Sequence, residues 1–150
     1  MTKPISMTTG PTDVLKVLSL SPLEEDHASL QAIVGHSKWM LCKAANLASA
    51  RTLLEQHEIA VVVCERELHP GTYVDVLELM TGLPKTPALI VTSRLADDKL
   101  WSEALNLGAW DVLAKPFERT EVVRSVKSGW QHWYDQIHQP ARVMRVSAAS

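Results

Sequence analysis

The chain has 150 residues, of which 46% are hydrophobic and 21% charged, and its formal net charge is −2 at pH 7. This length suits a single domain with a full hydrophobic core, and the charge lacks the basic excess of nucleic-acid-binding proteins, so we expect no nucleic-acid partner. Because no apolar run could span a membrane or serve as a secretion signal, we expect a cytoplasmic protein with no membrane partner.

Apolar runs and helical patterns alternate along the chain between two polar ends. Residues 1–13 lack hydrophobic periodicity and are predicted to be a flexible leader, and residues 139–150 a flexible tail. Between them, strand-length apolar runs alternate with apolar residues at helical spacing. The predicted elements, in chain order, are strand 14–20, helix 22–34, strand 39–45, helix 47–57, strand 59–64, helix 72–82, strand 88–93, helix 97–107, strand 110–114 and helix 118–138.

Several helix ends carry capping residues. Ser21, Pro22 and Glu24 together predict a capping box at the start of the first helix. Asn46 is placed to cap the second helix, and Gly108 is placed to end the fourth in the left-handed conformation. These signals set the predicted boundaries between helices and strands.

Five alternating strand–helix units predict a parallel sheet with helices on both faces, because right-handed crossovers connect parallel strands. We therefore predict an α/β fold of the flavodoxin-like, doubly wound kind. It should have three αβα layers and a five-stranded sheet in the order 2-1-3-4-5. One domain, residues 14–138, accounts for the whole pattern.

The third strand leads into the first candidate site residue. Ile59–Val63 is a continuous apolar run, typical of a strand buried on both faces, and Cys64 separates it from Glu65. Glu65 is therefore predicted at the carboxyl edge of the sheet, where open α/β folds place their sites. The alternative is that Glu65 is an ordinary solvated acid at the end of a strand.

Three segments at the predicted strand ends carry a family resemblance: VTS at 91–93, LAKPF at 113–117 and CERELHPG at 64–71. Together they resemble the CheY-like receiver domains of bacterial two-component response regulators. The resemblance covers about residues 14–134, in the family's order of elements. It implies a CheY-like fold and a role in phosphorelay signal transduction.

In that family a Mg²⁺ ion, a hydroxyl and an ammonium hold a phosphoryl group at the carboxyl edge. The resemblance implies that Glu65 occupies the phosphoacceptor position. It also places Thr92, Lys115 and Pro116 at the switch positions that contact the phosphate. These residue types fit the task, because a phosphoryl group brings about two negative charges and strong acceptor oxygens.

Three positions depart from the family pattern. Ser21 and Pro22 stand where two acids would hold Mg²⁺, and compensation of the helix dipole explains the acids at 24–26. Glu65 replaces the aspartate that accepts phosphate, and its longer side chain displaces the attacking oxygen. Val112 replaces the switch aromatic. We therefore expect no Mg²⁺ binding, no other metal or cofactor, and no phosphorylation.

The predicted function is that of a stand-alone, atypical receiver that is not an enzyme. Glu65 should mimic the phosphorylated residue by pairing with Lys115 within about 4 Å, in a partly exposed ion pair that adds only about 0–1 kcal/mol of stability. The expected partner is another protein, a histidine kinase or a downstream effector, bound near helices 97–107 and 118–138; a homodimer is the alternative. The candidate interaction surface consists of Trp101, Trp110, Trp130, Trp133 and Tyr134.

Two other functions stay open from the sequence. The chain could be a working receiver that accepts phosphate on Glu65 or a neighbouring residue. It could also be an enzyme that binds flavin or a nucleotide, since flavodoxin-like folds do so at the same edge. The segment 19–24, SLSPLE, counts against the enzyme, because it has no glycine to admit a phosphate and its acid would repel one.

Overall fold

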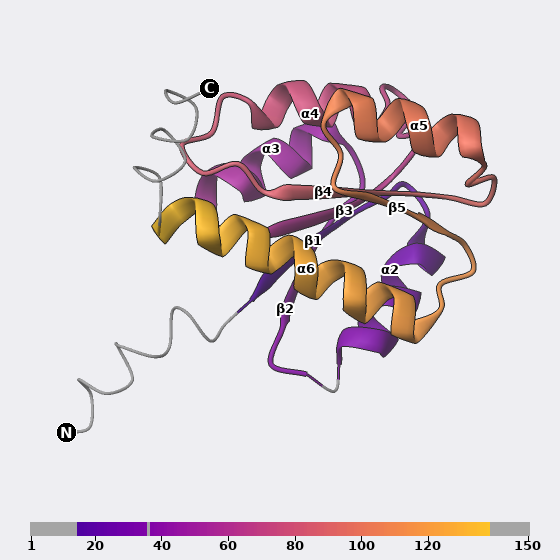
Figure 1. Cartoon of the computed structure of the whole chain (residues 1–150), viewed down its shortest axis with the longest axis horizontal. Helices are drawn as coiled ribbons and strands as arrows, with labels where there is room; N and C mark the ends of the chain where they lie inside the picture. The colour runs from indigo at the N-terminus through magenta and orange to yellow at the C-terminus, as the bar shows by residue number, and fades with distance from the viewer. Residues whose placement is uncertain (1–14, 36, 139–150) are drawn as a thin grey trace, which may run out of the picture.

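The structure of the chain is a computed structural model, which describes residues 15–35 and 37–138 (Figure 1). The predicted leader and tail, 1–13 and 139–150, lie outside the described residues. The predicted elements are all present, with ends that differ by two residues or fewer. Labelled as in Figure 1, they are β1 (Lys16–Leu20), α2 (Glu24–Val34), β2 (Met40–Ala44), α3 (Leu47–Gln56), β3 (Val61–Glu65), α4 (Tyr73–Met80), β4 (Ala88–Ser93), α5 (Asp98–Leu107), β5 (Asp111–Ala114) and α6 (Arg119–His138).

The strands form one parallel sheet in the order β2-β1-β3-β4-β5, which confirms the predicted doubly wound fold. Helices α2 and α6 cover one face, and α3, α4 and α5 cover the other (Figure 1). Each helical layer encloses its own cluster of buried side chains against the sheet. Strand β3 is buried from Val61 to Cys64, because its side chains point alternately into the two clusters.

Strand register places the predicted site residues at one edge. Glu65, the last residue of β3, is paired with Thr92 near the end of β4. Ser93 is paired with Ala114, the last residue of β5, and the next residue, Lys115, donates its backbone N–H to the Ser93 carbonyl. All three strands therefore present their carboxyl ends side by side.

The helix caps match the sequence only in part. Asn46 accepts a hydrogen bond from the third residue of α3, and Gly108 ends α5 with φ 112°, as predicted. The predicted capping box at Ser21 is wrong, because α2 begins later, with Leu23 as an N-cap that makes no side-chain hydrogen bond. Thr72 instead forms a capping box at α4, which the sequence analysis missed. The hydroxyl oxygen of Ser21 still accepts a 3.0 Å hydrogen bond from Leu23 N–H, and its proton remains available for another partner.

None of the helices from α2 to α6 combines the length and the apolar composition needed to cross a membrane.

Candidate functional site

A group of polar side chains meets around Lys115 at the carboxyl edge of the sheet. The Nζ atom of Lys115 lies 2.6 Å from Glu65 Oε1 and 2.9 Å from Asp26 Oδ2. Ser21 Oγ donates a 2.6 Å hydrogen bond to the same Asp26 oxygen. We call these residues together with Thr92 the Lys115 cluster. It joins the ends of β1, β3, β4 and β5 to the first turn of α2.

The contact between Glu65 and Lys115 confirms the predicted ion pair. Its burial, however, corrects the prediction of a partly exposed pair, since the side chains are 12% and 7% exposed. Breaking a buried pair is costly, because the remaining charge is left with neither water nor a counter-ion. We therefore expect a larger effect on stability than the partly exposed pair of the sequence analysis would give.

Asp26 is the site residue whose role the sequence analysis assigned wrongly. Compensation of the helix dipole fits Glu24 and Glu25, which are exposed, but Asp26 is only 5% exposed and binds Lys115. The distinguishing signal is helical spacing. Asp26 precedes the buried Leu30 by four residues, so the two share the inward face of α2.

A second set of buried polar groups holds the start of α2 against β1. His27 is 4% exposed, with Nε2 2.9 Å from the carbonyl oxygen of Ser21 and Nδ1 2.7 Å from Ser19 Oγ. Because a carbonyl oxygen can only accept, Nε2 carries a proton, and in the neutral ring Nδ1 accepts from the Ser19 hydroxyl. Ser21 is thus held by Asp26 at its hydroxyl and by His27 at its carbonyl oxygen. Its neighbour Pro22 is exposed.

The remaining predicted switch residues lie at the same edge. Thr92 is 2% exposed, and its hydroxyl is 3.5 Å from Glu65 Oε1, at the outer limit of a hydrogen bond. Val112 is 7% exposed and belongs to the core beneath α3, α4 and α5. Pro116 follows Lys115 across a cis peptide bond. An aliphatic side chain therefore occupies the position of the switch aromatic.

Two opposing effects set the pKa of Lys115. Burial lowers the pKa because desolvation disfavours the ammonium, but hydrogen bonds and attraction from Glu65 and Asp26 outweigh it, so the pKa lies above its ordinary value of 10.5. Since the folded-state pKa is raised, the stability that Lys115 contributes is complete below about pH 10.5 and is lost as the pH rises through the folded-state pKa. At neutral pH the ammonium is charged and contacts two carboxylates.

The cluster offers little to a divalent cation. The carboxylates of Asp26 and Glu65 both bind Lys115, and Ser21 and Pro22 add no charge. Within 15–35 and 37–138, no group of three or more His, Cys, Asp or Glu side chains is placed to hold a metal ion. Mg²⁺ requires near-octahedral oxygen ligands, so these residues fit an ammonium better than Mg²⁺.

We expect millimolar Mg²⁺ to leave the melting temperature of the protein unchanged, because a ligand raises this temperature only when it binds the folded state. Thermal unfolding with Mg²⁺ and with sodium chloride of equal ionic strength tests this. A rise specific to Mg²⁺ that disappears in Asp26→Asn would contradict it.

A cavity of about 320 Å³ opens in front of the cluster, between the start of α2 and the loops after β4 and β5. Arg94 and Glu25, both exposed, form an ion pair of 3.0 Å beside this cavity. The lining residues are Glu25, Asp26, Ser29, Arg94, Lys115, Pro116 and Phe117. A partner that approaches Lys115 from this side meets charges of both signs.

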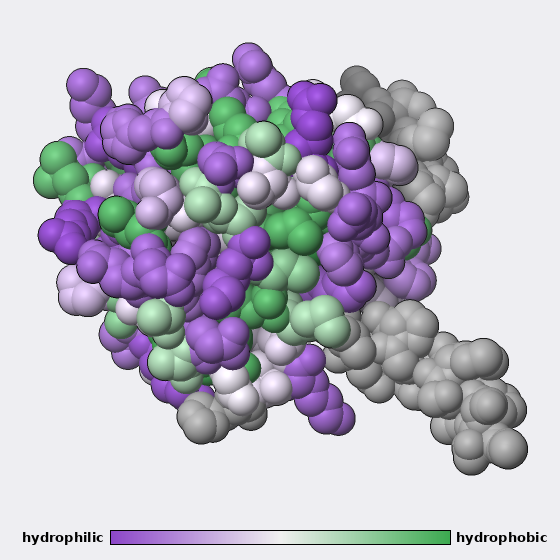
Figure 2. Space-filling model, turned by 180° about the vertical axis from the view of Figure 1, so that it is seen from behind, coloured by the Kyte–Doolittle hydropathy of each residue, from purple (hydrophilic) through white to green (hydrophobic). Residues whose placement is uncertain are grey.

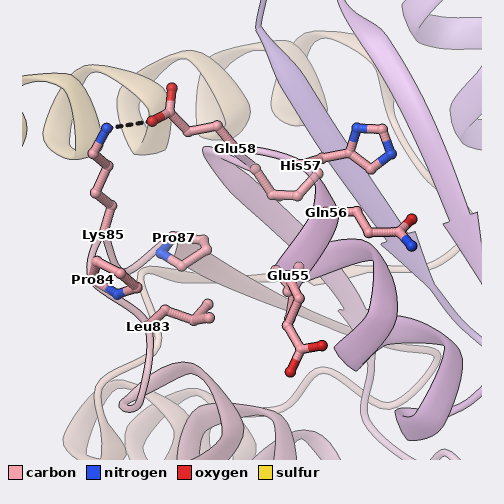
Figure 3. A pocket seen from close by; sticks show the side chains of 10 residues that line it. Glu55, Gln56, His57, Glu58, Leu83, Pro84, Lys85 and Pro87 are labelled. Atoms are coloured by element: carbon pink, nitrogen blue, oxygen red, sulfur yellow. Dashed lines mark hydrogen bonds and ion pairs between the residues drawn. The ribbon is translucent and has the colours of Figure 1, made fainter.

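A separate cavity of about 360 Å³ lies between the loops that follow α3 and α4 (Figure 3). Its walls include Leu83, Pro84 and Pro87, and an ion pair between Lys85 and Glu58 spans one side (Figure 3). These loops precede β3 and β4, so the cavity lies at the amino ends of the strands. None of its lining residues belongs to the Lys115 cluster.

The five aromatic residues of the predicted interaction surface differ in exposure. Trp101 on α5 is 51% exposed and Trp110, just before β5, is 36% exposed. Trp130, Trp133 and Tyr134 on α6 are half-buried, and the two tryptophans pack against the core beneath α2 and α6. Trp101 and Trp110 therefore carry most of the aromatic surface that the structure leaves exposed on this side.

Comparison with known proteins gives one family match. The model of the response regulator receiver domain matches residues 25–127. Among curated proteins, the chain is 27% identical over 143 residues to the transcriptional regulatory protein DpiA of Escherichia coli K12. This match covers 86% of the chain but 62% of DpiA, so the chain spans less than two thirds of that relative.

Solved structures show the same CheY-like fold. The signal receiver domain of an HD domain-containing protein from Pseudomonas fluorescens superposes with a TM-score of 0.75 at 20% identity, covering 83% of this chain and 93% of that one. The beryllofluoride-activated NtrC4 receiver domain dimer superposes with a TM-score of 0.72 at 20% identity, covering 79% and 98%. At such identity these matches show the fold alone.

Proposed function

Because the chain belongs to the response regulator receiver domain family, we propose that it acts in two-component signalling without accepting phosphate itself. Receiver domains are generally signalling domains rather than enzymes. In this proposal Glu65 supplies, permanently, the negative group that phosphorylation supplies in other receivers. The protein then works by binding another protein.

One observation carries the proposal: Lys115, which would contact the phosphate, is already bound to two carboxylates. Its Nζ atom lies 2.6 Å from Glu65 Oε1 and 3.1 and 2.9 Å from the two oxygens of Asp26, so two carboxylates neutralise the ammonium. A phosphoryl group on Glu65 would have to displace these contacts inside a nearly buried cluster. The departures at Ser21 and Pro22 support the same conclusion, because no acid pair is present there to recruit Mg²⁺.

The proposed partner is a histidine kinase or a downstream effector, bound at the surface of α5 and α6. Trp101 and Trp110 favour this surface, because exposed tryptophans are common anchors of protein interfaces. A second copy of this chain is the alternative occupant. NtrC4 is described as a receiver dimer, and that arrangement is a candidate here.

Two finer parts of the proposal rest on the sequence. The composition led us to expect a cytoplasmic protein, and we keep this as part of the proposal. That the receiver acts without a further domain stays a prediction. The match covers 62% of DpiA, so the comparison says nothing about the remainder of that relative.

We expect neither the wild-type protein nor Glu65→Asp to gain the mass of a phosphoryl group from acetyl phosphate and Mg²⁺. In the wild type Lys115 is occupied, and in Glu65→Asp the shorter acid still lacks the acid pair at Ser21 and Pro22. Intact-mass spectrometry after incubation measures the result directly.

A receiver domain with the usual acid pair and aspartate, labelled under the same conditions, is the positive control. Labelling of the wild type, with the site mapped to Glu65 or a neighbour, would contradict the proposal and support a working phosphoacceptor. Rapid labelling of Glu65→Asp alone would show that a metal site exists at residues other than Ser21 and Pro22.

A further inference from the structure

Strand β2 forms an open edge of the sheet, away from the Lys115 cluster. Among residues 15–35 and 37–138, it pairs with β1 alone. Its five residues, Met40–Ala44, vary between buried and exposed. An edge strand of this kind offers unpaired backbone groups to any extended chain that reaches it.

The hydrogen bonds show which backbone groups of β2 are open. Met40 N–H donates to the Leu15 carbonyl, and the Ala44 carbonyl accepts from Ser21 N–H, so both residues face β1. Backbone direction alternates along a strand, and therefore Leu41 and Lys43 direct their N–H and C=O groups away from the sheet. No described loop or side chain bonds to these four groups.

Three of the five side chains of β2 are apolar and partly exposed. Met40 is 48% exposed, and Leu41 and Cys42 are half-buried. On the face in Figure 2, hydrophobic residues appear in groups among hydrophilic ones. Recognition at this edge would therefore rest on backbone hydrogen bonds and charge, with a minor apolar contribution.

Three lysines lie in or beside β2. Lys43 lies in the strand and is exposed, Lys38 precedes it and is exposed, and Lys16 is paired with Met40 across β1. Among the residues that the structure describes, these three lysines form no ion pair. In a protein with a net charge of −2, this edge is locally basic.

This charge decides between two occupants of the edge. A second copy paired through β2 would bring two sets of three lysines together, and like charges across a strand pair are destabilising. Lysine on an edge strand is a common protection against such self-association. For an extended segment with acidic side chains the charges attract instead, because its carboxylates would lie beside the exposed Lys43.

We propose that the edge of β2 is a second protein-binding surface, which takes up an extended acidic segment of a partner as a sixth strand. The segment hydrogen-bonds to the open backbone groups of Leu41 and Lys43. Its apolar residues pack beside Met40 and Cys42, and its acidic residues lie beside Lys43 on the opposite face. This surface is independent of the Lys115 cluster and of the surface on α5 and α6.

The expected complex is weak and sensitive to salt. Five residues of edge strand provide an interface well below the roughly 1,200 Å² of stable complexes. Exposed ion pairs contribute about 0.2–1 kcal/mol each and are screened by salt. Such a surface suits a transient contact.

Hydrogen exchange by nuclear magnetic resonance on the full chain tests the proposal, with a blocked heptapeptide of alternating glutamate and valine as the probe. In the free protein the amides of Leu41 and Lys43 should exchange quickly, and those of Met40 and Cys42 slowly. The peptide should slow exchange at Leu41 and Lys43 and shift their resonances. The same peptide with lysine in place of glutamate should have no effect.

Two variants sharpen the test. Leu41→Pro removes an outward N–H without removing a hydrogen bond to β1, and it should abolish protection of the Lys43 amide, whereas Leu41→Val should keep it. Lys43→Glu should weaken binding of the peptide about tenfold. This variant keeps the proposal testable if Leu41→Pro does not fold. Lys127→Glu on α6 is the matched charge control and should bind normally.

Peptide-induced shifts confined to another surface, or equal binding by the wild type and Lys43→Glu, would overturn the proposal. So would protection of Leu41 and Lys43 that appears without peptide as the protein concentration rises. That outcome would assign the edge to a second copy of the chain.

Discussion

Replacing Lys115 with methionine is expected to lower the free energy of unfolding by about 3–5 kcal/mol, the usual cost of leaving a buried charge without its partner. The side chains of Asp26 and Glu65 are 7% and 12% exposed, so little water can replace the ammonium. Methionine keeps most of the apolar stem of lysine, and the loss therefore reports the charge. Urea denaturation at pH 7 measures it.

The pH dependence of this variant gives a second test. Without the ammonium, two carboxylates face each other in a nearly buried site, so the folded state takes up protons more readily than the unfolded chain. Stability should then rise as the pH falls from 7 toward about 5, since stability rises with falling pH wherever the folded state binds more protons. The wild type has no such unpaired carboxylates in the cluster.

The matched control removes all three charges together, as Lys115→Met, Asp26→Asn and Glu65→Gln. This triple variant should recover much of the lost stability, because replacing a whole buried charged group is far less costly than removing one partner. A loss below about 1 kcal/mol in Lys115→Met would mean that the cluster behaves like an exposed ion pair, as the sequence alone suggested.

Replacing Gly129 with leucine is expected to destabilise the protein by about 1–3 kcal/mol through overpacking. Gly129 lies where α6 crosses the sheet closely, and a Cβ atom there would be 3.1 Å from Ala88 Cβ and 3.3 Å from Trp110 Cδ1. A leucine side chain has no room between these atoms, so α6 would have to move away from the sheet. Thermal and urea unfolding measure the effect.

Gly129→Ala distinguishes the effect of helix propensity from the effect of packing against the sheet. Alanine favours the helix over glycine by about 1 kcal/mol, which should offset much of the tight contact that its single Cβ makes. We therefore expect a change within about 1 kcal/mol of the wild type. A leucine variant as stable as the alanine variant would show that α6 is loosely packed at this point.

The alternating elements, their order and the parallel sheet could be read from the sequence, because each depends on patterns within a short segment. The strand Val61–Glu65 is recognisable from its continuous apolar run, and Gly108 from its place after a helical pattern. Glu65 was assigned to the carboxyl edge from the end of its apolar run, and the family resemblance assigned Thr92 and Lys115 to the same edge, where the structure places all three.

The helix starts show where local patterns mislead. Ser21 has the residue type and spacing of an N-cap, but its hydroxyl donates to the buried carboxylate of Asp26. The same oxygen accepts the Leu23 N–H, so the local bond forms as well, but α2 begins only after Leu23. The charge of Asp26 is buried because Lys115, 89 residues away along the chain, approaches it.

By itself, the sequence determined the fold and the edge on which the site lies, because hydrophobic periodicity and strand ends are local properties, and the family resemblance added Thr92, Lys115 and the position of Ser21. Only the tertiary structure decided that Asp26 joins the Lys115 cluster, that the cluster is nearly buried, and which backbone groups of β2 are open. The physical reason is that burial and ion pairing depend on packing between segments far apart in the chain. A local sequence pattern does not show which distant residues come into contact.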